Sequence, residues 1–156
     1  MNLMKGVLMT KINEDLLDAW LRLSISVNNP RLVTEITYNE SLICNILYKH
    51  SHSEKSTPLT ATDLCKMTNM LKSQMNRTLN QLEEKQLISR ERSTVDKRQV
   101  FVTMNLQQCH IYETQHKQIL GILDAVIGKL GTERSKEAIK LLNAISEVAE
   151  QLNLGK

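Results

Sequence analysis

Apolar residues recur at helical spacing through most of the chain. Over residues 12–27 they fall every three or four positions, with acidic residues near the start, where the helix dipole favours them. This pattern predicts an amphipathic helix. Pro30 ends it, because proline has no amide hydrogen and pushes the preceding residue out of the α region. The last third predicts two further helices, over 107–130 and 132–152, with Gly131 as the stop between them.

Capping signals divide the middle of the chain. Two capping boxes, in which a threonine is followed three residues later by an acidic residue, are formed by Thr37 with Glu40 and by Thr60 with Asp63. The first predicts a helix that ends near residue 50, before a polar loop over 51–58. The second predicts a short helix that stops at Asn69.

The stretch KSQMNRTLNQLEEKQL, residues 72–87, predicts a further helix, directly after the short one, with an unusual outer face. Its inward stripe is Leu71, Met75, Leu79 and Leu82. The outward positions of the first turns carry amides, a hydroxyl and one arginine, whereas an ordinary solvated face carries Glu and Lys pairs. Together with the preceding short helix, this stretch predicts a helix-turn-helix.

After Leu87 the pattern changes from helical spacing to alternation. Residues 88–92 and 100–104 predict two strands, and residues 93–99 must turn between them. The tip of this hairpin displays Asp96, Lys97 and Arg98. The predicted fold class is therefore mainly α with a small β-hairpin wing: a winged helix-turn-helix with additional N- and C-terminal helices.

Composition supports this fold and narrows the function. The 156 residues are 41% apolar and 24% charged, and only five glycines and two prolines occur, which favours one mostly helical domain. No apolar run reaches the 18 or so residues of a membrane span, so we expect a cytoplasmic protein without membrane contact. With no glycine-rich phosphate loop and no catalytic cluster, we expect neither an enzyme nor a cofactor.

The formal net charge of +3 is concentrated in one part of the chain. Residues 72–98 contain seven Lys or Arg and four Asp or Glu, while the rest of the chain contains 13 of each. The whole excess therefore lies on the predicted helix and hairpin, as expected for contact with a polyanion.

These side-chain types suit double-stranded DNA. In the major groove arginine pairs with guanine, and asparagine or glutamine with adenine. The candidate DNA-binding residues of the helix are Lys72, Ser73, Gln74, Asn76, Arg77, Asn80 and Gln81. In the hairpin, Lys97 or Arg98 would enter the adjacent minor groove. Taken alone, such a helix is more often an ordinary polar surface; the capped neighbouring helix, the basic hairpin and the segregated charge together favour DNA.

The run TATDLCKMTNMLKSQMNRTLNQLEEKQLISRERSTVDKRQVFVTM resembles the winged-helix core of the MarR family of bacterial transcriptional regulators, above all in N-R-x-L-x-x-L-E-x-K-x-L-I and in the D-x-R of the hairpin. The resemblance implies one domain, 1–156, with a DNA-binding core at 37–105 and dimerisation helices at 10–36 and 106–156. It also implies a homodimer and, for the hairpin, an Arg98 that enters the minor groove and an Asp96 that stabilises the wing. The chain departs from the family pattern at Gln86, where glycine is common, and in the loop over residues 51–58, which is longer than usual.

A transcriptional regulator of this type would bind a pseudo-palindromic operator, with recognition helices roughly 34 Å apart. It would act as a repressor that an effector relieves, and that effector could be a small molecule. The terminal helices expose more apolar surface than a small winged domain could cover, which independently favours a dimer. The alternative is a winged-helix adapter that binds proteins and not DNA.

Cysteines and histidines could in principle sense an oxidant or a metal. Cys44 and Cys65 lie on apolar stripes, which leaves Cys109 as the more exposed candidate thiol sensor. His50 and His52 are two positions apart, which points them to different sides of a helix, and His110 and His116 do not share one turn. We therefore expect no metal site from the sequence.

Overall fold

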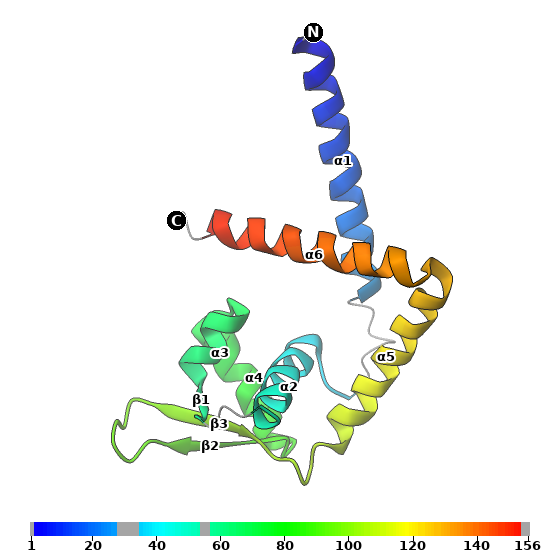
Figure 1. Ribbon diagram of the computed structural model, residues 1–156. Coiled ribbons are helices and arrows are strands. Elements are labelled where there is room, and N and C mark those ends of the chain that lie inside the picture. The colour runs from blue at the N-terminus through cyan, green and yellow to red at the C-terminus, as the bar shows by residue number, and fades with distance from the viewer. Residues whose placement is uncertain (1, 28–34, 54–56, 154–156) are drawn as a thin grey trace. The chain divides into compact units, whose positions relative to one another are not determined.

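The computed structural model describes residues 2–27, 35–53 and 57–153 (Figure 1). The chain forms two compact units, residues 1–115 and 116–156, and the boundary falls inside one helix. The predicted helix break at Pro30 lies outside the described residues, as does part of the predicted loop, residues 54–56.

The first unit begins with α1 and contains the winged-helix core. Helix α1 (Asn2–Val27) starts earlier than predicted, because its leading residues are mostly leucine, methionine and lysine, which are good helix formers. The core elements follow in the order α2 (Tyr38–Ser51), β1 (Leu59–Thr60), α3 (Ala61–Thr68), α4 (Lys72–Glu84), β2 (Ile88–Arg92) and β3 (Val100–Met104). The chain continues into α5 (His110–Leu130), whose first turns belong to this unit.

Both predicted capping boxes are confirmed. The Thr37 hydroxyl accepts a hydrogen bond from the Glu40 N–H at 3.3 Å, and the Glu40 carboxylate accepts one from the Thr37 N–H at 2.5 Å. Thr60 and Asp63 exchange the same two bonds at the start of α3. Asn69 ends α3 in the left-handed region at φ 54°, as its position predicted.

The predicted hairpin is confirmed and belongs to a three-stranded antiparallel sheet. Strand β2 pairs with β3 in a register that runs from Ile88 opposite Met104 to Arg92 opposite Val100. Strand β1, which sequence reasoning missed because it is two residues long, pairs with the other edge of β3. Helices α2, α3 and α4 contact this sheet, and α4 also contacts α2 and α3 (Figure 1).

The second unit consists of the rest of α5 and of α6 (Thr132–Asn153). Gly131 separates the two helices at φ 82°, a conformation that glycine adopts without steric cost. The two predicted helices and the stop between them are therefore confirmed.

The hydrophobic core lies in the first unit, between the helices and the sheet. Its largest fully buried side chains are Tyr112, Ile36, Ile43, Leu64, Met75, Leu79, Leu82, Leu87, Val102 and Cys44. Members come from α2, α3, α4, β3 and the start of α5. The core therefore fixes α4 and the wing to one scaffold.

The exposure prediction for the cysteines was wrong at Cys109, which is 3% exposed, while Cys65 is only half-buried. The polar neighbours of Cys109 in the sequence concealed its position at the start of α5, where its thiol donates to the Leu106 carbonyl at 3.2 Å. Burial, and then the Glu113 carboxylate, raise the pKa of the Cys109 thiol; burial raises the pKa of Cys44 to about 12. A buried thiol with a raised pKa is a poor redox sensor.

Helix α4 ends at Glu84, earlier than the predicted 87, in a Schellman motif. The Gln86 N–H donates to the Glu83 carbonyl at 2.9 Å, and the Leu87 N–H donates to the Leu82 carbonyl at 3.0 Å. Gln86 has φ 58°, so this glutamine adopts the left-handed conformation, which glycine adopts without steric cost.

We predict that Gln86→Gly stabilises the protein by roughly 0.5 to 1 kcal/mol, because glycine relieves the cost of a side chain at positive φ. Urea unfolding followed by circular dichroism measures this. Gln86→Ala is the matched control and should give no such gain, since alanine keeps the Cβ. A destabilised glycine variant would contradict the assignment of strain to this residue.

We predict that only Cys65 reacts readily with an aromatic disulfide reagent in the native protein at pH 8, because the other two thiols are buried and their pKa values are raised. The absorbance of the released thiolate measures the reaction. Cys65→Ser should abolish the fast phase, and guanidinium should expose Cys44 and Cys109. A fast phase that persists in Cys65→Ser would contradict this burial.

Candidate nucleic-acid interface

The outer face of α4 presents most of the predicted DNA-binding side chains. Its buried face is Met75, Thr78, Leu79 and Leu82. Lys72, Ser73, Gln74, Asn76, Arg77 and Asn80 are exposed, and Gln81 is half-buried. Buried positions three and four apart leave the other side of the helix to solvent. This side offers one guanidinium group surrounded by amides.

The predicted inward stripe needs one correction at the start of α4. Leu71 is 73% exposed, because it is the N-cap residue and its backbone is extended, with φ −63° and ψ 148°. Thr78 is buried in addition to the predicted apolar positions, and its hydroxyl donates to the Gln74 carbonyl at 2.9 Å. The internal hydrogen bond makes burial of this polar side chain possible.

The turn of the wing is held by side chains within it. The Ser93 hydroxyl, which is buried, accepts from the N–H groups of Val95 and Asp96 at 3.2 and 3.1 Å. One Asp96 carboxylate oxygen accepts from the Arg98 N–H at 3.0 Å. Lys97 and Arg98 are both exposed. The turn thus fixes the backbone while leaving two cationic side chains free to extend outward.

Ion pairs divide the seven basic residues of the 72–98 stretch into two groups. Lys85 pairs with Glu40, and Arg90 pairs with Glu83. Lys72, Arg77, Arg92, Lys97 and Arg98 form no ion pair with any described residue, and all five are exposed. The cations available to an external anion therefore lie on α4 and on the wing.

The Glu83–Arg90 pair connects these two elements. Arg90, on β2, donates from its Nε to a Glu83 carboxylate oxygen at 2.9 Å and also from its Nη2 to the same oxygen. The hydrogen bond from Arg90 lowers the pKa of the Glu83 carboxyl group, which favours its charged form. The last turn of α4 is thereby tied to the first strand of the wing.

Lys85, at the end of α4, pairs with a buried carboxylate. Its Nζ lies 2.8 Å from one oxygen of the Glu40 carboxylate and 2.9 Å from the other. Glu40 is only 1% exposed, so Lys85 neutralises a buried charge. Sequence reasoning missed this because the partners are 45 positions apart.

Arg92 is a further candidate that sequence reasoning passed over. It ends β2, is exposed, and lies on the same wing as Lys97 and Arg98. The sequence-based prediction included only the hairpin tip, Asp96 to Arg98, although Arg92 contributes to the same local charge excess. Its exposure and its lack of an ion pair among the described residues add it to the cationic surface.

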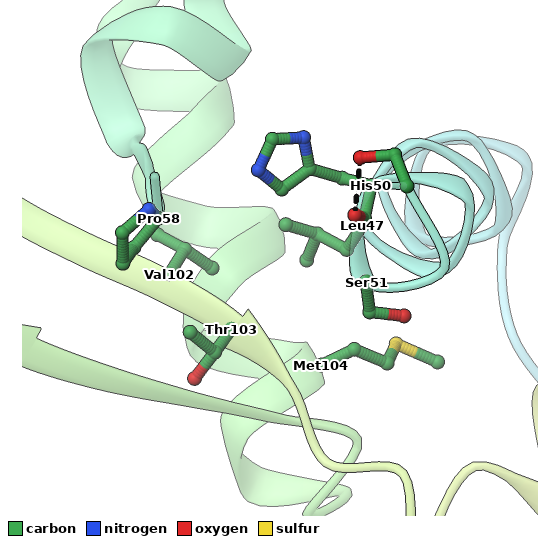
Figure 2. Close-up of a pocket in the computed structure, with 8 residues that line it drawn as sticks. Leu47, His50, Ser51, Pro58, Val102, Thr103 and Met104 are labelled. Atoms are coloured by element: carbon green, nitrogen blue, oxygen red, sulfur yellow. Dashed lines mark hydrogen bonds between the residues drawn. The ribbon is translucent and has the colours of Figure 1, made fainter. Parts of the chain in front are cut away.

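A cavity of about 270 Å³ lies between the C-terminal turn of α2 and strand β3 (Figure 2). Its lining is Leu47, His50, Ser51, Ser53, Pro58, Val102, Thr103 and Met104. The His50 Nε2 lies within hydrogen-bonding distance of the Thr57 carbonyl, at 2.8 Å. His50 is the one ionisable residue in this lining, and the volume is just below the usual range for ligand pockets.

Within the described residues, no three His, Cys, Asp or Glu side chains gather closely enough to hold a metal ion. In the same part of the chain, no helix combines the length and hydropathy that crossing a membrane would require.

Comparison with solved structures shows the same fold in other proteins. MarR from Staphylococcus aureus, solved with salicylate and kanamycin, is 24% identical; the match covers 92% of this chain and 94% of that chain, with a TM-score of 0.70. FabT from Streptococcus pneumoniae, solved in complex with DNA, is 20% identical over 92% of this chain and 99% of that chain, with a TM-score of 0.66. BldR from Sulfolobus solfataricus is 18% identical over 89% and 95%, with a TM-score of 0.67.

Sequence comparison is more specific. Uncharacterised HTH-type transcriptional regulators from S. aureus strains Mu50 and N315 are 29% identical over 115 residues, which is 72% of this chain and 75% of theirs. The profile of the transcriptional regulator SarA/Rot family matches residues 32–119, a range that contains the whole winged-helix core. The chain is therefore a helix-turn-helix transcriptional regulator that belongs to the SarA/Rot family, whose winged-helix fold is related to that of MarR.

Proposed function

We propose that this regulator binds double-stranded DNA with α4 in the major groove and the wing in an adjacent minor groove. The observation that carries the proposal is the pair of exposed cationic patches on one scaffold. Arg77 lies on α4 and Arg98 at the wing tip, and neither has an ion-pair partner among the described residues. Five such cations on a solvated surface would be an ordinary finding without the helix-turn-helix that presents them.

Base recognition falls to the outer face of α4. Arg77 can donate two parallel hydrogen bonds to guanine, and Asn76, Asn80 and Gln74 are of the type that pairs with adenine. Lys72 and the free N–H groups of the first turn would contact phosphates and set the register.

The wing contributes a contact that depends on groove shape. Arg98 or Lys97 would enter the minor groove, where narrow A·T-rich stretches have a strongly negative potential. Asp96 stabilises the wing in this proposal, because its carboxylate holds the Arg98 backbone at the tip. Arg92 would contact phosphates beside it.

We also propose a homodimer on a pseudo-palindromic operator. Large apolar side chains are exposed on three helices: Leu16, Leu17 and Trp20 on α1; Leu123, Val126 and Ile127 on α5; Leu141, Leu142 and Val148 on α6. Exposed apolar stripes of this extent favour association. The domain assignment goes with the proposal: one domain, 1–156, in which residues 10–36 and 106–156 form the dimer around the 37–105 core.

Regulation is proposed as repression that an effector relieves. MarR was solved with salicylate, a small molecule, which supports this type of control. The cavity beside His50 is the candidate pocket in this chain, and its size would restrict it to a small effector.

We predict distinct effects for the two arginines. Arg77→Ala should weaken binding and relax base preference at one position by about 1 to 3 kcal/mol, because a bidentate base contact is lost. Arg98→Ala should weaken binding across sequences. Fluorescence anisotropy on duplexes that the wild-type protein selects from a random library, repeated at several salt concentrations, measures both.

Arg134→Ala is the matched control, because Arg134 is an exposed arginine on α6, outside the proposed DNA interface. Unchanged affinity in both Arg77→Ala and Arg98→Ala would mean that the docking is wrong. If the wild-type protein binds no duplex even at low salt, the adapter alternative replaces the DNA proposal.

We predict that the wild-type protein sediments at twice its chain mass of 17.9 kDa and that Leu123→Glu dissociates it, because a buried charge opposes an apolar interface. Sedimentation equilibrium measures the mass. Gln118→Glu, on an exposed polar position of the same helix, is the control that should stay dimeric. A monomeric wild-type protein would contradict the dimer.

A further inference from the structure

The segment that leads into α2, residues 35–40, contacts both the end of the recognition helix α4 and the start of α5. It contains Glu40, the one charged residue that is buried within the described part of the chain, and Ile36, which is 2% exposed. Its Glu35 carbonyl also accepts a hydrogen bond from a side chain at the end of α4. The end of α4 and the start of α5, which are distant in sequence, are therefore both held by residues 35–40.

On the α4 side, the contact is made by Lys85, the C-cap residue. Its ammonium group donates to both Glu40 oxygens and to the Glu35 carbonyl, the last at 2.9 Å. An ammonium group has three donors, and three acceptors surround this one. The geometry restrains the end of α4 in position, in a way that one exposed ion pair would not.

On the α5 side, the contact is made by Gln115. Its side-chain oxygen accepts from the Ile36 N–H, and its side-chain nitrogen donates to the Ile36 carbonyl, both at 3.4 Å. Gln115 is 4% exposed. Further along α2, the Tyr112 hydroxyl donates to Asn45 at 3.2 Å, so the first turns of α5 follow α2.

We infer that Lys85 and Gln115 are positioning residues for DNA binding: through residues 35–40 they set the orientation of the recognition helix relative to α5. This inference rests on the proposed function. Helix α5 continues without interruption from Gln115 to Leu130 and carries exposed apolar residues of the proposed dimer. The orientation of α4 relative to α5 would then determine the spacing of the two recognition helices on an operator.

The test begins without DNA. Nitroxide labels on Asn80→Cys and Thr114→Cys, both exposed positions, report the distance from α4 to α5 by double electron–electron resonance. Cys65→Ala removes the half-buried thiol, while Cys44 and Cys109 are buried and stay unlabelled. In this background, Lys85→Met and Gln115→Leu should broaden or shift the distance distribution, and Lys85→Arg should preserve it.

Lys136→Met is the matched control, because Lys136 forms an exposed ion pair with Glu133 at 2.9 Å. It loses the same charge and should leave the distribution unchanged. Circular dichroism verifies that each variant folds. Gln115→Leu changes no charge, so it carries the test if Lys85→Met does not fold.

The second measurement uses the duplex that the wild-type protein selects. With the labels absent, Lys85→Met and Gln115→Leu should lose about fivefold or more in affinity, the usual scale of coupling between distant sites. The salt dependence should stay that of the wild type, because no phosphate contact is removed. A merely destabilised protein would lose apparent affinity only in proportion to its active fraction, which a stoichiometric titration with excess DNA measures separately.

Unchanged distance distributions in both folded variants would overturn the inference, whatever the DNA result. Altered distributions with wild-type affinity would also overturn it, since the orientation would then not matter for binding. A wild-type protein that binds no DNA would overturn the proposed function separately, because the distance measurement does not depend on DNA.

Discussion

The carboxylate of Glu40 is the group around which the winged-helix core is organised. A carboxylate that is 1% exposed must be hydrogen-bonded and paired, since an unpaired buried charge costs several kcal/mol. Thr37 supplies an N–H and Lys85 supplies the countercharge. Thr37 is the N-cap of α2 and Lys85 is the C-cap of α4. The hydrogen bond and the ion pair of the Glu40 carboxylate therefore fix these two helices against each other. The same ammonium group also reaches the Glu35 carbonyl, which brings the entry to α2 under this constraint.

Features with a local cause could be predicted from the sequence. The two capping boxes, the stop at Asn69 and the alternation of the hairpin strands depend on residues a few positions apart, and the structure has all of them. Features with a distant cause could not. Strand β1 exists because β3 offers it an edge, and Cys109 is buried because it joins a core cluster whose other members include residues of α2, α4 and β3. Local pattern carries no information about either partner.

The candidate site shows the same division. Helical spacing alone was enough to predict which side of α4 faces outward, and six of the seven α4 candidates are exposed. Counting charges could not identify which cations are free. Of seven basic residues, Lys85 and Arg90 are paired, one with a residue of α2 and one with a residue on α4. The local excess thus consists of cations held on two neighbouring elements, which is a stronger basis for binding a polyanion than net charge.

The contacts at the end of α4 explain how a glutamine is held in the left-handed conformation there. A glutamine at φ 58° is unfavourable by itself, and such residues persist where their surroundings hold them in place. Here the Asn105 side chain donates to the Gln86 carbonyl at 3.1 Å, and Leu87 and Leu82, both fully buried, close the Schellman motif. Lys85, directly before Gln86, is fixed by Glu40, and Glu83 is fixed by Arg90. Positions 82 and 87 are thus anchored in the core, and positions 83 and 85 are held by ion pairs. The backbone at Gln86, which lies among them, therefore has little freedom to relax. The strained residue is a consequence of the contacts that orient the recognition helix.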